Sequence, residues 1–175
     1  MATMKKSKKT AAICVVAGIL LIAASLLLST TQAAAETVKS KIVVVDTRFE
    51  YIDVGEVEGN PLGITLHEGK GLTMFENGEV AFFKFSGQFQ TMVGARGFTV
   101  NTFEDGSTQW TKYQSTVRPG EGGEVQFFII EGAFEYIGGT GRFEGIRGKG
   151  SYTAKYFPTY GVMYAAESTA EYTLP

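Results

Sequence analysis

The chain has few of the residues that support covalent or metal-based chemistry. It contains one cysteine and one histidine in 175 residues. Cys14 lies in an N-terminal apolar run that we expect to be removed, which would leave neither a disulfide nor a thiolate in the rest of the chain. His67 has no second histidine or cysteine with which to share a zinc ion. We therefore predict no metal site and no cofactor, and we expect His67 to be exposed in a turn beside Gly69 and Gly71.

The first 35 residues have the composition of an export signal. Four lysines lie among the first nine residues, and residues 11–29 are mostly apolar. Ala33, Ala34 and Ala35 supply the small side chains that signal peptidase accepts, so we predict cleavage before Glu36 and a periplasmic or extracellular protein. Because residues 11–29 are also long enough to span a bilayer, an uncleaved N-terminal anchor is the alternative.

The charge of the remaining residues, 36–175, is acidic. Removing the four leader lysines from 16 basic residues leaves 12, against 18 acidic residues, which gives a formal charge of −6. Binding of nucleic acid or of an anionic membrane surface needs clustered positive charge, so this balance argues against both partners.

The sequence after Glu36 lacks the periodicity of long helices. It consists of apolar and aromatic stretches of strand length separated by glycine-rich turns. This pattern predicts one all-β domain over residues 36–175, a closed antiparallel barrel of about eight strands, because closure removes exposed edges. A two-sheet β-sandwich is the alternative. The expected strands are residues 42–53, 62–68, 72–76, 79–90, 97–103, 108–118, 124–136, 149–157 and 162–173.

Two of these strands share a sequence frame. Residues 78–89 and 123–134 agree at the seven named positions of Gly-Glu-Val-x-Phe-Phe-x-x-x-Gly-x-Phe. The second glycine of the frame, Gly87 or Gly132, interrupts the strand after two adjacent phenylalanines. Glycine within a strand commonly marks a bulge or a tight bend, so the repeat predicts two equivalent corners of one barrel.

The most specific string in the chain is Gly-Gly-Thr-Gly-Arg-Phe-Glu-Gly at residues 138–145. It resembles the late Gly-Gly-Ser-Gly and Phe-Glu-Gly steps of allene oxide cyclases and the Gly-Gly-Thr-Gly-x-Phe motif of dirigent proteins. The resemblance implies an eight-stranded, lipocalin-like barrel. A phosphate-binding loop would need Lys-Ser or Lys-Thr after the last glycine and then a helix, and this sequence does not provide them. The residues themselves therefore predict a structural turn.

The resemblance also suggests one catalytic residue. Allene oxide cyclases close a fatty-acid epoxide into a cyclopentenone with the help of a glutamate on the first strand, and by position Glu50 matches that residue. Strand alternation places Glu50 on one face with Asp46 and Arg48. If that face lines the lumen, its carboxylates are available for acid–base work. The opposite face, with Val43, Val45, Phe49 and Tyr51, makes the better core, which favours Glu50 outside.

Aromatic residues are candidates for a ligand site in the lumen. An apolar pocket with a few hydroxyls is typical of a small-molecule site, although the same side chains could simply fill a narrow barrel. The chain is then expected to bind a small apolar or aromatic molecule, with a cyclase-like isomerase, a dirigent-like protein or a purely structural module as alternatives. Homo-oligomers are possible. The candidate lining residues are Phe83, Phe85, Phe128, Tyr152, Tyr156, Tyr164 and Tyr172.

The predicted leader cleavage can be tested on the exported protein. Intact-mass spectrometry is expected to give the mass of residues 36–175, because signal peptidase cuts after the three alanines. The mass of the full chain, recovered from the membrane fraction, would contradict cleavage and support the anchor.

Overall fold

The computed structural model describes residues 35–90, 93–121 and 125–175, except for the side chains of residues 57, 60, 61 and 162–166. The predicted signal peptide lies outside these residues, so its cleavage and the alternative anchor stay predictions. Within the described part of the chain, no helix has the length and apolarity that a membrane crossing requires.

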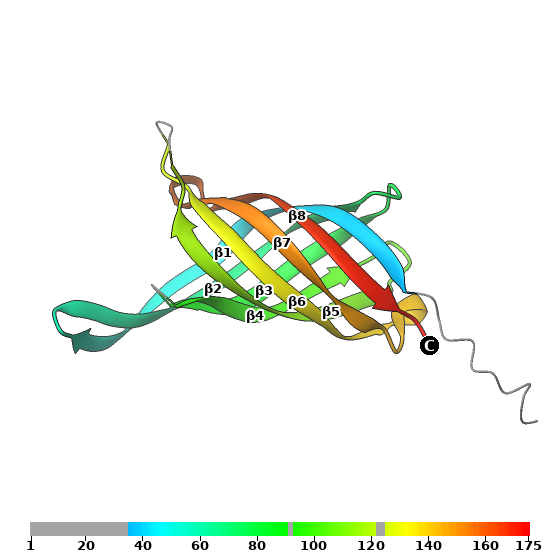
Figure 1. The fold of residues 1–175 in the computed structure, drawn as a ribbon, viewed down its shortest axis with the longest axis horizontal. Coiled ribbons are helices and arrows are strands. Elements are labelled where there is room, and N and C mark those ends of the chain that lie inside the picture. Colours follow the sequence, from blue (N-terminus) through cyan, green and yellow to red (C-terminus); the bar gives the residue numbers. More distant parts are fainter. Residues whose placement is uncertain (1–34, 91–92, 122–124) are drawn as a thin grey trace, which may run out of the picture. The chain divides into compact units, whose positions relative to one another are not determined.

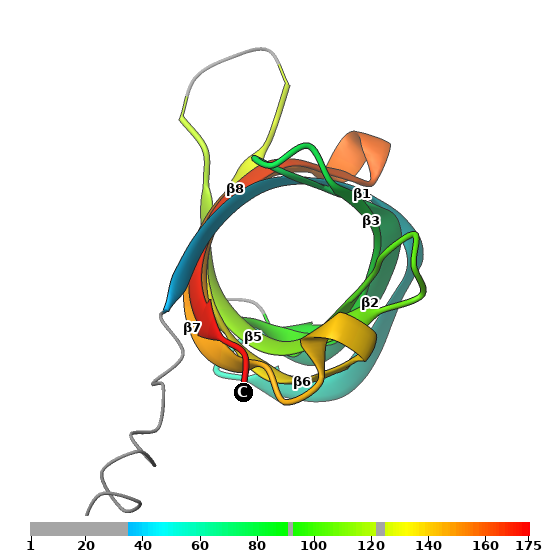
Figure 2. The same ribbon diagram turned by 90° about the vertical axis from the view of Figure 1, so that its right-hand side faces the viewer.

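Eight antiparallel strands form one closed barrel, as the sequence predicted. Each strand pairs with the next along the chain, and β8 pairs with β1 to complete the ring (Figure 1, Figure 2). The strands are β1 (Glu36–Val57), β2 (Asn60–Phe75), β3 (Val80–Gln90), β4 (Gly94–Thr102), β5 (Thr108–Pro119), β6 (Phe128–Thr140), β7 (Arg147–Phe157) and β8 (Val162–Thr173). Two 3-10 turns flank β7, namely η1 (Gly141–Phe143) and η2 (Pro158–Tyr160).

Strand alternation sorts side chains between the lumen and the solvent. In β3, Ala81, Phe83 and Phe85 are buried, whereas Phe82 and Lys84 between them are exposed. Successive side chains of a strand point to opposite faces, so this alternation gives the barrel an apolar interior. The same rule applies around the ring and fixes which residues can reach the lumen.

The structure corrects the expected break between two short strands at residues 69–71. β2 runs without interruption from Asn60 to Phe75. Side chains at Gly69 and Gly71 would collide with the Phe85 ring and the Val43 carbonyl, so these glycines allow close packing and do not form a turn. The expectation that His67 is exposed in a turn is therefore wrong, because His67 lies within β2 and lines the lumen.

A β-bulge in β1 corrects the predicted core face of this strand. The register with β2 shifts between Asp46 and Arg48, so the lumen-facing side of the strand changes there. Before the bulge, Val44 is buried at 1% exposure while Val45 is 45% exposed, which contradicts the prediction that Val45 faces the core. Asp46 consequently faces the lumen, whereas Arg48 beyond the bulge does not share its face.

The glycines of the repeated frame serve a different purpose from the predicted one. The pairing register runs through Gly87 and Gly132 without a shift, so the bulge interpretation is wrong at both positions. A side chain at Gly87 would meet the Tyr113 hydroxyl, and one at Gly132 would meet the Tyr152 ring. Each glycine thus makes room for a tyrosine that leans across the sheet from another strand.

The Gly-Gly-Thr-Gly-Arg-Phe motif packs one end of the barrel. Phe143 of η1 lies 4.8 Å from Phe103 between ring centroids, and Ile146 is fully buried in the same cluster. The Arg142 guanidinium covers both rings, at 4.7 Å from Phe103 and 4.8 Å from Phe143, and forms an ion pair with Glu79. The motif is a structural turn whose side chains fill this end of the lumen.

The opposite end of the barrel carries a projecting hairpin. β1 pairs with β8 only as far as Val45, and β2 pairs with β3 only from Thr65 onward. Residues 48–64 therefore pair only within the β1–β2 hairpin, which extends past the ring (Figure 1). This hairpin lies at the end of the barrel opposite η1.

The buried cluster around Phe143 and Ile146 is expected to contribute much of the free energy of unfolding. Ile146→Ala should lower the free energy of unfolding by about 2–5 kcal/mol, because it leaves a cavity in a fully buried cluster. Ile137→Ala is the matched control, since Ile137 is 43% exposed; its effect should stay within about 0.5 kcal/mol. Urea denaturation of both variants measures the difference, and equal losses would contradict this assignment of the core.

Candidate functional site

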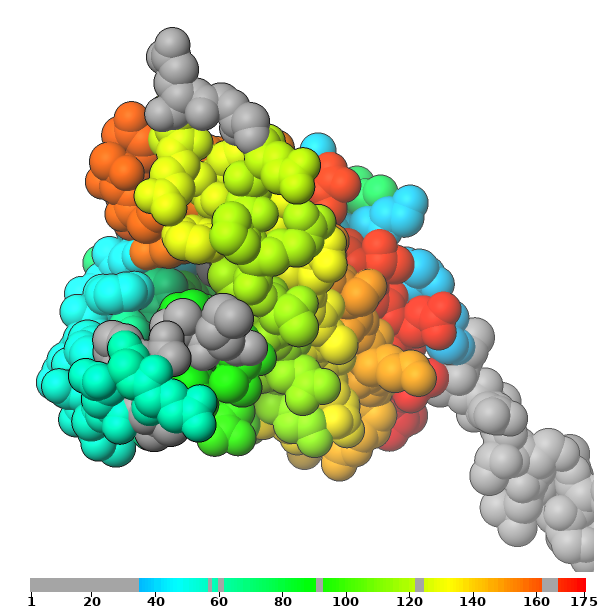
Figure 3. Space-filling view, turned by 60° about the vertical axis from the view of Figure 1, so that its left-hand side comes forward, coloured from blue at the N-terminus to red at the C-terminus, as the bar shows by residue number. Residues whose placement is uncertain are grey.

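The lumen contains a cavity of about 350 Å³. Phe49 and Pro158 line the cavity and are also exposed, Phe49 at 58%, so the cavity meets the solvent at the end with the β1–β2 hairpin. Figure 3 views the barrel from this side, with a recess between β1–β2 in cyan and β6–β7 in yellow and orange. The phenylalanine and tyrosine side chains that line the cavity are Phe49, Phe75, Phe83, Phe85, Phe89, Tyr113, Phe128, Phe134, Tyr136, Tyr152 and Tyr156.

The predicted lining residues divide into three groups. Five surround the cavity, namely Phe83, Phe85, Phe128, Tyr152 and Tyr156. Tyr172 lies in the packed cluster at the η1 end, where its hydroxyl donates a hydrogen bond of 3.0 Å to Glu36. The side chain of Tyr164 lies outside the described part of the chain. Whether the five bind a ligand stays a prediction.

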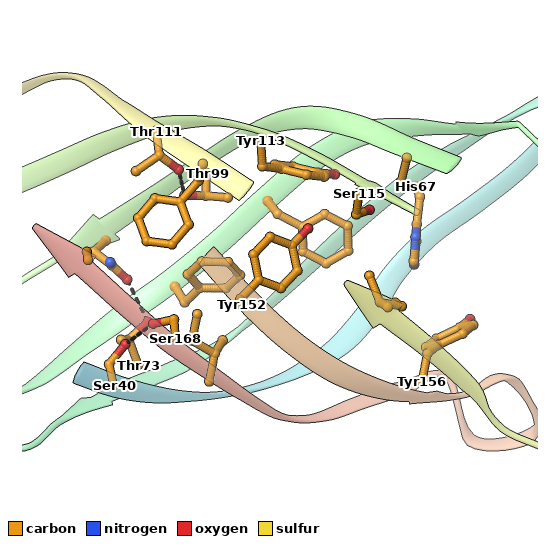
Figure 4. Close-up of a pocket in the computed structure, with 18 of the residues that line it drawn as sticks. Ser40, His67, Thr73, Thr99, Thr111, Tyr113, Ser115, Tyr152, Tyr156 and Ser168 are labelled. Atoms are coloured by element: carbon orange, nitrogen blue, oxygen red, sulfur yellow. Dashed lines mark hydrogen bonds between the residues drawn. The ribbon is translucent and has the colours of Figure 1, made fainter. Parts of the chain in front are cut away.

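A row of residues across four strands brings Tyr113 toward His67. His67 of β2 pairs with Gly87 of β3, Gly87 pairs with Gly97 of β4, and Gly97 pairs with Tyr113 of β5. The Tyr113 hydroxyl lies over both glycines, in the space that side chains there would occupy. Its hydroxyl therefore reaches to the strand next to His67. Figure 4 shows both side chains on the cavity wall.

Tyr152 repeats this arrangement in a second row. It leans over Gly132 toward Ser115, and these three residues pair in sequence across β7, β6 and β5. Ser115 is only 9% exposed and lines the cavity. Although it lies near Tyr152, its hydroxyl makes no hydrogen bond of normal geometry. A buried hydroxyl without a partner is costly, so a polar atom inside the cavity would be stabilised there.

Asp46, His67 and Tyr156 form a hydrogen-bonded group in the half of the lumen nearer the opening. His67 Nε2 lies 2.5 Å from Asp46 Oδ1, and the Tyr156 hydroxyl donates to Asp46 Oδ2 at 2.7 Å. Asp46 lies two residues after the buried Val44 and therefore faces inward by strand alternation, and its backbone N–H donates to the Gly161 carbonyl at 2.8 Å. Three aromatic rings pack edge-on to the imidazole, at centroid distances of 5.4 Å for Phe49, 4.9 Å for Phe85 and 5.8 Å for Tyr156.

The candidate base Glu50 lies on the outer surface. Its side chain is 53% exposed and forms an ion pair with Arg48, which also contacts Glu68. The carboxylate that reaches the lumen from β1 is Asp46, which the sequence placed on the same face as Glu50. A catalytic role for Glu50 stays a prediction, and its position gives that role no support.

Three further pairs of polar groups in the lumen bind each other. Ser40 and Ser168 share a hydrogen bond of 2.7 Å, as do Thr99 and Thr111, and Thr73 donates to an amide oxygen of β4 at 2.7 Å. These pairs satisfy hydroxyls that face an apolar space. Among the described residues, no three histidine, cysteine, aspartate or glutamate side chains gather in a way that could hold a metal ion.

Comparisons with known proteins give a fold neighbour. No protein-family model matches the chain, and no curated protein sequence matches it. Among solved structures, the chain is similar to a pterocarpan synthase dirigent protein, with a TM-score of 0.46 and 13% sequence identity. The alignment covers 82% of this chain and 88% of that one.

Buried tyrosines should make the barrel less stable at alkaline pH. Burial raises the pKa of Tyr113, Tyr136, Tyr152 and Tyr156, and burial together with the Glu36 hydrogen bond raises the pKa of Tyr172 to about 12. In the unfolded chain tyrosine ionises near a pKa of about 10. Above that pH the unfolded state binds fewer protons than the folded state, so stability falls as the pH rises toward 12.

Urea denaturation between pH 9 and pH 12 tests this dependence. Tyr172→Phe should give a shallower fall of the unfolding free energy with pH than the wild type. Tyr160→Phe is the control, because Tyr160 is exposed in η2; this variant should keep the wild-type slope. An unchanged slope in Tyr172→Phe would contradict the contribution of this hydroxyl.

Proposed function

We propose that the barrel binds one small apolar or aromatic molecule in its lumen. The observation that carries this proposal is the cavity of about 350 Å³, walled by aromatic rings and open to solvent at one end. Ligand pockets of proteins span roughly 300–1,000 Å³ and combine an apolar lining with a few polar groups, so the lumen suits a small ligand.

The polar groups of the lumen give this ligand an orientation. The hydroxyl of Ser115, which lacks a partner, and the nearby hydroxyls of Tyr113 and Tyr152 lie in one part of the wall. An apolar molecule with one polar atom would direct that atom to this part. The apolar remainder would contact phenylalanine rings such as Phe83 and Phe85. A wholly apolar ligand would leave Ser115 without a partner.

The alternatives differ in what the lumen would do. A purely structural module would have a filled lumen, and the volume of the cavity favours a ligand over that reading. A cyclase-like isomerase would need a base in the lumen, which Glu50 on the outer surface does not supply. A dirigent-like protein would orient the reaction of a bound molecule without supplying a base, and it would use the same cavity. We also propose that the protein is exported from the cytoplasm. This proposal rests only on the signal peptide predicted at residues 1–35.

A cavity-filling substitution tests binding. The neutral fluorescent probe N-phenyl-1-naphthylamine should bind the purified exported protein saturably, with one site per barrel. Ala95→Trp places a large side chain in the cavity and should weaken binding at least about tenfold, a loss of about 1.4 kcal/mol. Fluorescence titration measures the dissociation constant.

Ala133→Trp is the matched control, because Ala133 is exposed between two lumen-facing residues of β6. It makes the same chemical change on the outer surface and should leave the affinity as it was. Equal binding by both variants would show that the probe does not occupy the lumen. A wild-type protein that fails to bind this probe, and that carries no small molecule detectable by mass spectrometry of an organic extract, would overturn the proposal.

A further inference from the structure

We propose that His67, held by Asp46, is a general base that removes a proton from a molecule bound in the lumen. This inference rests on the proposed binding function and adds a reaction class to it, namely proton transfer from the bound molecule. It stands on the geometry of the Asp46–His67–Tyr156 group and on the position of that group at the cavity. His67 is the sole histidine of the chain.

The hydrogen bonds of Asp46 fix which nitrogen of His67 is free. The Asp46 carboxylate accepts from the Tyr156 hydroxyl through Oδ2, and it faces His67 Nε2 through Oδ1. An ionised carboxylate only accepts hydrogen bonds, so the neutral imidazole carries its proton on Nε2. Nδ1 is then the proton acceptor of the ring. An imidazole oriented in this way by a carboxylate is a common arrangement for a general base.

The surroundings of His67 favour proton transfer from a bound molecule. The groups in contact with the imidazole are Asp46 from β1, Tyr156 from β7 and the rings of Phe49 and Phe85. Burial raises the pKa of Tyr156, as does its hydrogen bond to Asp46, so Tyr156 keeps its proton and remains a donor to the carboxylate. Asp46 is then the negative charge beside the imidazole, and it stabilises the imidazolium that forms when Nδ1 takes a proton.

The Tyr113 hydroxyl lies near His67, in the row of residues that joins the two across β2 to β5. Tyr113 reaches over Gly97 and Gly87, and Gly87 is the direct neighbour of His67 in the sheet. Burial raises the pKa of Tyr113, so its hydroxyl stays protonated. A molecule bound in the cavity against these two side chains would meet a proton acceptor and a hydrogen-bond donor. The donor would stabilise negative charge that develops as the proton leaves.

The probe reaction is the ring opening of 5-nitrobenzisoxazole, an apolar aromatic molecule that needs only a base. His67 Nδ1 takes the proton from C3, the electrons of that C–H bond complete the carbon–nitrogen triple bond, and the nitrogen–oxygen bond breaks. The oxygen leaves as a coloured phenolate, so absorbance follows the reaction. The purified exported protein should accelerate it over buffer with saturation kinetics, and N-phenyl-1-naphthylamine should inhibit it by competition.

Substitutions then identify the base. His67→Gln should lower kcat by at least about 100-fold, which is the lower range of the contribution of a general base, while the affinity for N-phenyl-1-naphthylamine stays unchanged. Asp46→Asn should lower kcat without raising KM, because Asp46 positions the imidazole and does not touch the substrate. Glu68→Gln is the control: Glu68 is the residue next to His67 on β2, contacts Arg48 on the outer surface and should keep the wild-type rate.

Chemical modification covers the case in which His67→Gln does not fold. Diethyl pyrocarbonate acylates the neutral imidazole of the sole histidine, and it should abolish turnover unless N-phenyl-1-naphthylamine fills the lumen. Three results would overturn the proposal. They are full turnover after modification or in a folded His67→Gln variant, loss of turnover in Glu50→Gln, and probe binding with no turnover above buffer. The third would leave the binding function intact, whereas failure of both probes to bind would remove the binding function as well.

Discussion

The fixed volume inside eight strands is the constraint on which the rest of this structure depends. A barrel of this size has barely enough interior for its own side chains, so a large residue on one strand requires a small one on its neighbour. Tyr113 lies over Gly87 and Gly97, and Tyr152 lies over Gly132. These glycines let two tyrosines lie along the wall, and space remains at the centre. The cavity exists because the lumen face has no side chain at these positions.

The fold could be predicted because the information that determines it is local. Strand-length alternation of apolar residues, glycine-rich turns and the absence of helical periodicity are properties of neighbouring residues, and they were sufficient for a closed antiparallel barrel. Whether Gly69 and Gly71 form a turn or lie within a strand, and whether Gly87 marks a bulge or a close approach, could not be predicted in this way. A glycine marks either a turn or a close approach, and only its partner on the next strand, such as Phe85 or Tyr113, distinguishes the two.

The site was less predictable, because one inserted residue decides it. Alternation along β1 gave Asp46 and Glu50 the same face, and a sequence has no signal for the bulge that separates them. Asp46 lies before the bulge and faces the lumen with Val44, whereas Glu50 lies beyond the bulge on the outer surface, so the carboxylate in the lumen differs from the one implied by family resemblance. His67 was missed for a related reason, since its neighbouring glycines suggested a turn. Five of the aromatic side chains around the cavity, such as Phe83 and Tyr152, follow from strand parity, whereas Tyr172 has the same parity but lies in the packed cluster at the η1 end.

The packed end of the barrel affects how molecules exchange between the cavity and the solvent. The side chains of Phe103, Phe143 and Ile146 fill the lumen at η1, whereas the cavity meets solvent beside Phe49 and Pro158 at the other end. A molecule that enters and the molecule or water that it replaces must use the same opening. One occupant therefore has to leave before the next can arrive, and the barrier at the mouth affects the rate of entry and the rate of release alike. Residues at that rim would then control the rate of exchange independently of affinity.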